Sequence, residues 1–181
     1  MNTPVADPLP RVADGVVLRR LGVGDLAAFQ AYRLDPELGR YQGWSPMSPA
    51  EATDFLSAMG RSPLFVAGAW SQVGIAECSD PRLIGDIGLF LSQDMRQVEV
   101  GVTLRSQSQR RGLAGAAVGA AITLAFERTA AERVLGITDA RHLASVRLLQ
   151  RLGMRRVETK PVVFRGDACV GHVYAVARAG G

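Results

Sequence analysis

The sequence predicts a mixed α/β (α+β) domain with a central, mostly antiparallel sheet of about seven strands and four helices. Strand-like and helix-like segments follow one another in the order β-α-α-β-β-β-α-β-α-β-β, with an antiparallel run in the middle. A doubly wound dinucleotide fold needs regular alternation of strands and helices, which this order lacks. The 181 residues suffice for one core, so we expect a single domain over residues 1–181, with residues 1–11 as a loose N-terminal segment.

The first strand and the first helix are expected near the start of the chain. Residues 16–21 are typical of a short strand. Asp25 is expected to begin a helix, because Leu26, Phe29 and Tyr32 follow at the spacing that places apolar side chains on one helix face.

A second helix is expected to begin at Ser48. Ser48-Pro49-Ala50-Glu51 is a capping box with proline at the first helical position, and Gly60 is expected to end the helix after about Met59. The segments that follow are strand material around residues 65–70 and 73–77, a turn at Asp80-Pro81, and two antiparallel strands at residues 83–91 and 97–104 joined by residues 92–96.

The last third of the chain is expected to contain two helices and three strands. Residues 112–128 are helical in pattern, and residues 134–137 form a short apolar strand. Residues 143–152 are expected to form a helix that Gly153 caps. Its inward side chains would be Val146, Leu148, Leu149 and Leu152, and its outward ones Arg147 and Arg151. The last two strands are residues 156–164 and 168–178, joined by a turn at Arg165-Gly166-Asp167.

Composition excludes several classes of protein. Cys78 and Cys169 form neither a disulfide framework nor a CxxC metal site, so we expect no metal and a reducing, cytoplasmic location. Residues 1–11 lack the pattern of a secretory signal, and the weakly polar run at residues 112–126 is too short to cross a membrane. We therefore expect no membrane partner.

Positive charge is concentrated in one third of the chain. Residues 105–160 hold 11 basic and 4 acidic side chains, a net charge of +7, whereas the whole chain has +4. All but one of these cations are arginines, whose planar fork suits phosphate, although a coding bias would also favour arginine over lysine. The clustering indicates an anionic partner, either a nucleic acid or a phosphorylated small molecule.

The strand at residues 97–104 has two different faces. Alternation places Val98, Val100, Val102 and Leu104 on one face and Gln97, Glu99, Gly101 and Thr103 on the other. In a sheet covered on both sides, such a polar row lines a cleft or is paired, and a glycine within the strand suggests a bulge or a ligand against the backbone. The alternative is an ordinary solvent-facing strand.

The segment after this strand has the composition of a phosphate cradle. It joins a strand to the start of a long helix, whose first amides lack internal acceptors. Gly112, Ala114 and Gly115 leave room for an anion, while Arg110 and Arg111 add charge. The segment contains neither a Walker loop nor a GxGxxG fingerprint. The alternative is a helix start made small for close packing.

Three motifs resemble the GCN5-related N-acetyltransferase (GNAT) superfamily. Gln109-Arg110-Arg111-Gly112-Leu113-Ala114 is similar to the family's acetyl-CoA motif, Q/R-x-x-G-x-G/A. The run from His142 to Met154 is similar to its second motif, N-x-x-S-x-x-L-L-x-x-x-G-F. Glu99-Val100-Gly101 and the strand at residues 83–89 resemble the RimJ/RimL-like branch, which acetylates ribosomal protein N-termini. The resemblance covers about residues 15–178.

The resemblance implies an acetyl-CoA-dependent N-acetyltransferase with a GNAT-like sheet. Its fourth and fifth strands, here residues 97–104 and 134–137, would splay apart so that the pantetheine arm enters the gap and the diphosphate binds at residues 110–115. The implied residues for binding acetyl-CoA, as co-substrate, are Val100, Val102, Leu104, Gln109, Arg110, Arg111, Gly112, Leu113, Ala114, Gly115, His142 and Ser145.

The resemblance also suggests catalytic roles, with departures from the family pattern. Glu99 is the candidate base, and a backbone N–H near residues 100–102 is the oxyanion donor. The family's frequent tyrosine acid falls at Leu149, so Ser145 is the candidate acid, unless its hydroxyl is bonded only to local backbone. His142 stands in place of the usual asparagine, where it binds the cofactor, moves a proton or is simply solvated.

The acceptor and the partners stay open at this point. The implied acceptor is a primary amine, either a protein N-terminus or a small molecule, and a homodimer is possible. The alternative from another class is a non-catalytic module of the same fold that binds or senses acyl-CoA. A nucleic-acid binder is disfavoured, because aromatic residues are only 6% of the chain and do not interleave with the basic ones.

Overall fold

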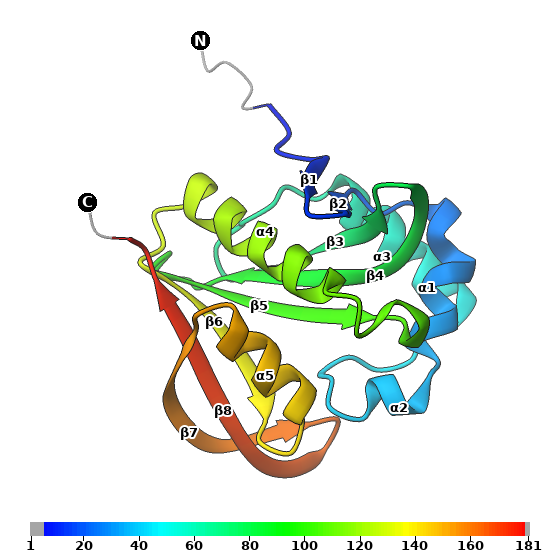
Figure 1. Ribbon diagram of the computed structural model, residues 1–181. Coiled ribbons are helices and arrows are strands. Elements are labelled where there is room, and N and C mark those ends of the chain that lie inside the picture. The colour runs from blue at the N-terminus through cyan, green and yellow to red at the C-terminus, as the bar shows by residue number, and fades with distance from the viewer. Residues whose placement is uncertain (1–5, 180–181) are drawn as a thin grey trace.

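A computed structural model describes residues 6–179. Its centre is an eight-stranded sheet in the order β1-β2-β3-β4-β5-β6-β8-β7, with helices on both faces (Figure 1). The strands are β1 (Arg11–Ala13), β2 (Val16–Arg19), β3 (Trp70–Glu77), β4 (Asp80–Leu91), β5 (Gln97–Leu104), β6 (Arg133–Asp139), β7 (Arg155–Phe164) and β8 (Asp167–Ala177). The α-helices are α1 (Leu26–Arg33), α2 (Pro36–Gly39), α3 (Pro49–Arg61), α4 (Leu113–Arg128) and α5 (Leu143–Arg151), and 3₁₀ turns span Val23–Asp25 and Ser106–Ser108.

Neighbouring strands are antiparallel except for β5 and β6. These two strands are parallel and pair only at Gln97–Arg133, Val98–Val134 and Glu99–Leu135. Beyond Glu99 they separate, while β4 stays paired with β5 as far as Leu104. The predicted mixed, mostly antiparallel sheet and its splay are therefore confirmed. The splay was expected between the fourth and fifth strands and lies between β5 and β6, because the additional strand β1 precedes the first predicted strand.

Each face of the sheet has its own apolar core. The larger core joins the sheet to α4 and includes Val98, Val100, Ala117 and Leu124. A second core packs α1 and α3 on the opposite face. We call these the α4 face and the α1 face. Helix α5 lies beside α4, and Leu149 packs with Met154 and Tyr174 there. The two cores hold the sheet between helices, so its open gap is the place where a ligand can enter.

Two expectations about glycine and proline were wrong. Helix α3 begins with the predicted capping box, but it continues through Gly60 to Arg61. A Cβ on Gly60 would lie 2.3 Å from the carbonyl oxygen of Leu21, so this glycine permits close packing rather than ending the helix. The turn expected at Asp80-Pro81 lies instead at residues 78–79, and Asp80 already begins β4. Proline is tolerated there because it stands at the start of the strand.

The remaining differences concern short elements. Residues 65–69 form no strand apart from one bridge between Ala67 and Leu91, and α2 was not foreseen. The N-terminal segment, expected to be loose over residues 1–11, is ordered at its C-terminal end, since Leu9 is buried in the larger core and Arg11 begins β1. The part of that segment at residues 1–5 lies outside the described residues. Short elements carry little periodicity, so packing decides them.

Candidate functional site

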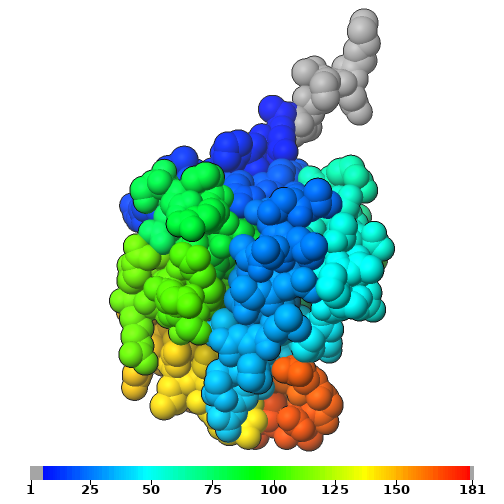
Figure 2. Space-filling view, turned by 90° about the vertical axis from the view of Figure 1, so that its right-hand side faces the viewer, coloured from blue at the N-terminus to red at the C-terminus, as the bar shows by residue number. Residues whose placement is uncertain are grey.

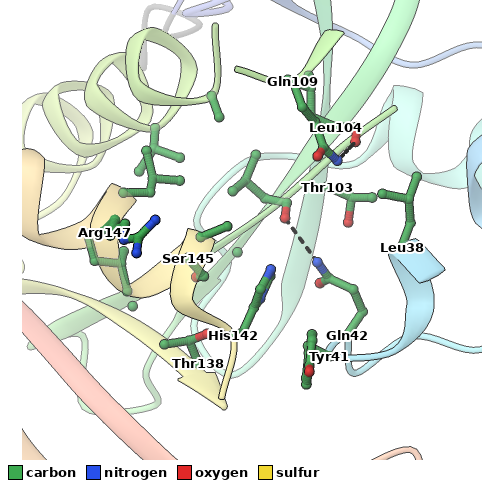
Figure 3. A pocket seen from close by; sticks show the side chains of 18 of the residues that line it. Leu38, Tyr41, Gln42, Thr103, Leu104, Gln109, Thr138, His142, Ser145 and Arg147 are labelled. Carbon is green, nitrogen blue, oxygen red and sulfur yellow. Dashed lines mark hydrogen bonds between the residues drawn. The ribbon is translucent and has the colours of Figure 1, made fainter. Parts of the chain in front are cut away.

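A cavity of about 850 Å³ opens where β5 and β6 separate. Its volume is in the range of small-molecule sites. It is lined from the α4 face by residues such as Val118 and Leu148, and from the α1 face by Tyr41 and Gln42 (Figure 3). The expected site residues that line it are Val100, Val102, Leu104, Gln109, Arg110, Gly112, Ala114, His142 and Ser145.

The N-terminus of α4 forms one end of this cavity. Gly112 is the N-cap, with φ of 81°, and no side chain caps the helix. Arg110, two residues earlier, also has a left-handed backbone, with φ of 60°. Such turns direct successive N–H groups into one concavity, and the first amides of a helix lack internal partners. A Cβ on Gly112 would touch nothing within 4 Å, so the concavity is open to an anion.

Arg111, Leu113 and Gly115 do not line this cavity. Arg111 donates two hydrogen bonds to Glu77, at 2.8 and 2.7 Å, and the side chain of Leu113 is buried in the core. Gly115 and Arg111 line a second cavity of about 660 Å³ on the outer side of α4. For Leu113 and Gly115, only the backbone amides face the helix start.

Two amide side chains satisfy the free edge of β5 inside the gap. Gln109 Nε2 donates to the carbonyl of Leu104 at 2.9 Å, and Gln42 Nε2 donates to the carbonyl of Val102 at 3.3 Å (Figure 3). A strand edge without its neighbour leaves such carbonyls unpaired. The two glutamines therefore occupy positions that an extended ligand arm would use.

His142 and Ser145 stand together at the start of α5, facing the cavity (Figure 3). The His142 ring stacks on Tyr41, with centroids 4.8 Å apart. Burial lowers the pKa of His142, so its imidazole is neutral at neutral pH. Ser145 is half-buried and lines the cavity.

Glu99 lies at the point where the splay begins, but it does not line the 850 Å³ cavity. Its neighbours across the sheet are Phe90 on β4 and Leu135 on β6. Burial beside these groups raises the pKa of the Glu99 carboxyl, while the positive charge of Lys160 acts in the opposite direction. A carboxyl with a raised pKa accepts a proton more readily than an exposed one does.

A buried charge cluster on the α1 face was not predicted. Asp86 accepts hydrogen bonds from Arg33 at 2.8 Å, from Gln72 at 2.6 Å and from the Tyr32 hydroxyl. The Arg33 guanidinium lies 4.5 Å from the ring of Trp44, whose Nε1 donates to Thr103 on β5. The cluster thus fixes the segment that carries Gln42. Arg33 and Asp86 are 53 residues apart, so no local signal announces their pairing.

The segment after α1 also reaches the end of the β7–β8 hairpin. Figure 2 shows this side of the molecule, where the blue and light-blue residues of α1 and α2 run down towards the orange part of the chain. A Cβ on Gly39 would lie 2.6 Å from a guanidinium nitrogen of Arg165, so the glycine lets this arginine of the β7–β8 turn approach the backbone closely. The segment therefore covers the cavity from the α1 face.

Two other kinds of site were sought in the described part of the chain. No three His, Cys, Asp or Glu side chains there are grouped as metal ligands. None of the helices at residues 6–179 combines the length and apolarity that crossing a membrane requires.

Comparison with known proteins identifies the family. The acetyltransferase (GNAT) domain model matches residues 16–155, whereas no curated protein matched the sequence. A GNAT-family acetyltransferase from Bacillus anthracis has a TM-score of 0.77 at 16% identity, covering 92% of this chain and 96% of that one. RimL, a ribosomal alpha-N-protein acetyltransferase in complex with coenzyme A, has 0.77 at 16%, covering 93% and 97%. The microcin self-immunity acetyltransferase MccE, in complex with acetyl-CoA and AMP, has 0.78 at 11%, covering 91% and 93%. Because the family model matches residues 16–155, which is most of the chain, the chain belongs to the GNAT acetyltransferase family.

Proposed function

We propose that the protein transfers the acetyl group of acetyl-CoA to a primary amine by direct attack in a ternary complex. One observation carries this proposal: β5 and β6 separate beyond Glu99, and the resulting cavity runs from the N-terminus of α4 through the sheet to the α1 face. A thioester and an amine can therefore enter from opposite faces and meet at the splay. Such positioning supplies much of the rate enhancement in a two-substrate reaction.

The residues present fit acetyl-CoA as co-substrate. The free amides and left-handed turn at residues 110–115 suit a diphosphate, and the Arg110 side chain lines the same cavity. The edge of β5 at Val100, Val102 and Leu104 offers backbone groups to an extended pantetheine arm. Gln42 and Gln109 would have to release their carbonyls for that arm. His142, being neutral, can donate or accept a hydrogen bond towards it.

The proposed reaction moves the acetyl group from sulfur to nitrogen in one direct transfer. The ammonium of the acceptor gives a proton to Glu99, directly or through water, and the neutral nitrogen attacks the thioester carbon. The N–C bond forms, the C–S bond breaks, and backbone N–H groups near Gly101 stabilise the oxyanion. As the amide forms, the nitrogen loses a second proton. Ser145, the candidate acid, gives its own hydroxyl proton to the departing sulfur and takes up this proton from the nitrogen, so coenzyme A leaves as the thiol. Its place in the cavity wall supports this role.

The test is a panel of primary amines incubated with acetyl-CoA, with thiol release and the acetylated product both measured. We expect release that depends on an amine. If the protein binds coenzyme A but no amine of the panel causes thiol release from acetyl-CoA, the result would instead indicate the non-catalytic acyl-CoA module.

The coenzyme site is tested separately by charge reversal at Arg110 and Arg111. The double variant should bind coenzyme A more weakly in calorimetry, and wild-type affinity would refute the cradle. Salt-dependent binding of RNA that persists with coenzyme A bound would favour a nucleic-acid function.

A further inference from the structure

A row of side chains crosses the α1 face of the sheet at the point where the splay begins. The registers place Trp70, Phe90, Glu99 and Leu135 side by side on β3, β4, β5 and β6. Paired residues on neighbouring strands share a face, and strands lie about 4.8 Å apart, so Trp70 and Glu99 are roughly 10 Å apart. Carboxylate and indole are thus within the span of one small molecule.

Trp70 and Phe90 form an apolar shelf beside the carboxylate. Their rings lie 5.3 Å apart, and Trp70 is 49% exposed. A Cβ on Gly88 would lie 3.1 Å from the Trp70 ring, so the glycine lets the indole lie against the sheet. The outer surface of the indole is left uncovered. A half-exposed tryptophan on a sheet face is a ready surface for a flat apolar group.

Beside this shelf, Gly101 leaves a bare floor at the edge of the cavity. Gly88 and Gly101 are paired in the next row of the same face. A Cβ on Gly101 would touch nothing within 4 Å, and Gly101 itself lines the 850 Å³ cavity. The cavity therefore reaches bare backbone at Gly101, which lies two residues from Glu99 on the same face of β5 and next to Gly88, where the Trp70 ring and the Gln72 side chain cover the sheet.

Charge around this floor suits one cation. Glu99 makes no ion pair among the described residues, although Lys160 lies near enough to influence it. Asp86, also on this face, is already bound by Arg33 and Gln72. Lys160 itself lies 3.5 Å from Glu158. A ligand with one ammonium matches this arrangement, whereas a second ammonium would meet Lys160.

We propose that the shelf of Trp70 and Phe90 selects the acceptor, and that the preferred acceptors are monoamines with a flat apolar group two or three bonds from the nitrogen. The ammonium lies at Glu99, and the apolar group stacks on Trp70. The inference rests on the proposed acetyl transfer and deepens it, because it names the class of amine. It assigns Trp70 a role in specificity that is separate from the chemical step.

The experiment compares phenethylamine, propylamine and spermidine as acceptors for the wild type, Trp70→Ala, Trp70→Phe and, as control, Val23→Ala. Val23 is also exposed and lies in the 3₁₀ turn before α1, away from the cavity. We expect kcat/KM for phenethylamine to exceed that for propylamine by about tenfold, the effect of a good aromatic contact. Trp70→Ala should abolish this preference through KM for phenethylamine, without changing KM for acetyl-CoA. Trp70→Phe should retain most of it.

Equal kcat/KM values for the two monoamines in the wild type, an unchanged preference in Trp70→Ala, or a preference for spermidine would each overturn the inference. A binding readout separates it from the proposed function. Phenethylamine is titrated calorimetrically into the wild type and Trp70→Ala, both saturated with coenzyme A. Binding to the wild type that Trp70→Ala loses supports the shelf even without turnover, while no binding refutes it. Absence of thiol release with every amine refutes acetyl transfer instead.

Discussion

Replacing Asp86 by asparagine should destabilise the fold more than a typical substitution does. Asp86 is 1% exposed, and its carboxylate accepts hydrogen bonds from Arg33 and Gln72. Asparagine keeps the volume but removes the charge, so the buried Arg33 guanidinium is left without its counter-ion. Breaking a buried pair in this way costs about 3–5 kcal/mol. Since asparagine still offers one acceptor oxygen, we expect the lower end, about 3 kcal/mol.

Thermal unfolding followed by circular dichroism measures this effect. In a chain of this length, a cost of about 3 kcal/mol corresponds to a Tm lower by about 6–12 °C. The matched control is Glu132→Gln, which breaks a pair with Arg96 whose side chains are 64% and 60% exposed and should leave Tm unchanged. If Asp86→Asn lowers Tm no more than this control does, the cluster is not a buried ion pair of consequence and the reasoning fails.

Three further predictions concern the site. Glu77→Gln frees Arg111, so coenzyme A should bind a few-fold more tightly in calorimetry; unchanged or weaker affinity would contradict a diphosphate role for Arg111. Glu99→Gln should lower kcat with little change in coenzyme affinity. Because burial raises the pKa of Glu99, wild-type activity should fall as the pH drops through that raised value, and the variant should lose this acidic limb; a limb that persists in the variant would assign it to another group. Gly101→Val should abolish phenethylamine acetylation by filling the bare floor, without lowering Tm, because a Cβ there touches nothing within 4 Å; unimpaired turnover would place the amine elsewhere.

Local patterns predicted the parts of the fold that local physics decides. The capping box at Ser48 and Glu51 is formed as expected, with both reciprocal hydrogen bonds present. The cap at Gly153 has the left-handed backbone that only glycine adopts at low cost. Alternation along β5 also placed Val98 and Val100 in the core correctly. In each case the signal and its consequence lie within a few residues.

Long-range pairings could not be predicted in the same way. Glu77 meets Arg111 across 34 residues, and this contact holds a side chain that was expected in the cradle away from the cavity. The Trp70–Phe90–Glu99 row depends on the registers of three strands, which alternation alone does not fix. Gln42 likewise reaches β5 from 60 residues away. The local patterns in the sequence identify these side chains as candidates but do not determine which of them are in contact.

Residue 149 is leucine where the second motif of the family frequently has tyrosine, and its side chain packs into the core. Leu149 is buried with Met154 and Tyr174, and a Cβ on Gly136 would lie 2.6 Å from it. The leucine thus presses against bare backbone of β6, beside the splay, where the motif resemblance would place a hydroxyl. Ser145 lies one helical turn earlier in α5 and lines the same cavity. If the enzyme protonates the thiolate itself, Ser145 is the group in position, and Ser145→Ala should lower kcat while leaving KM for acetyl-CoA nearly unchanged.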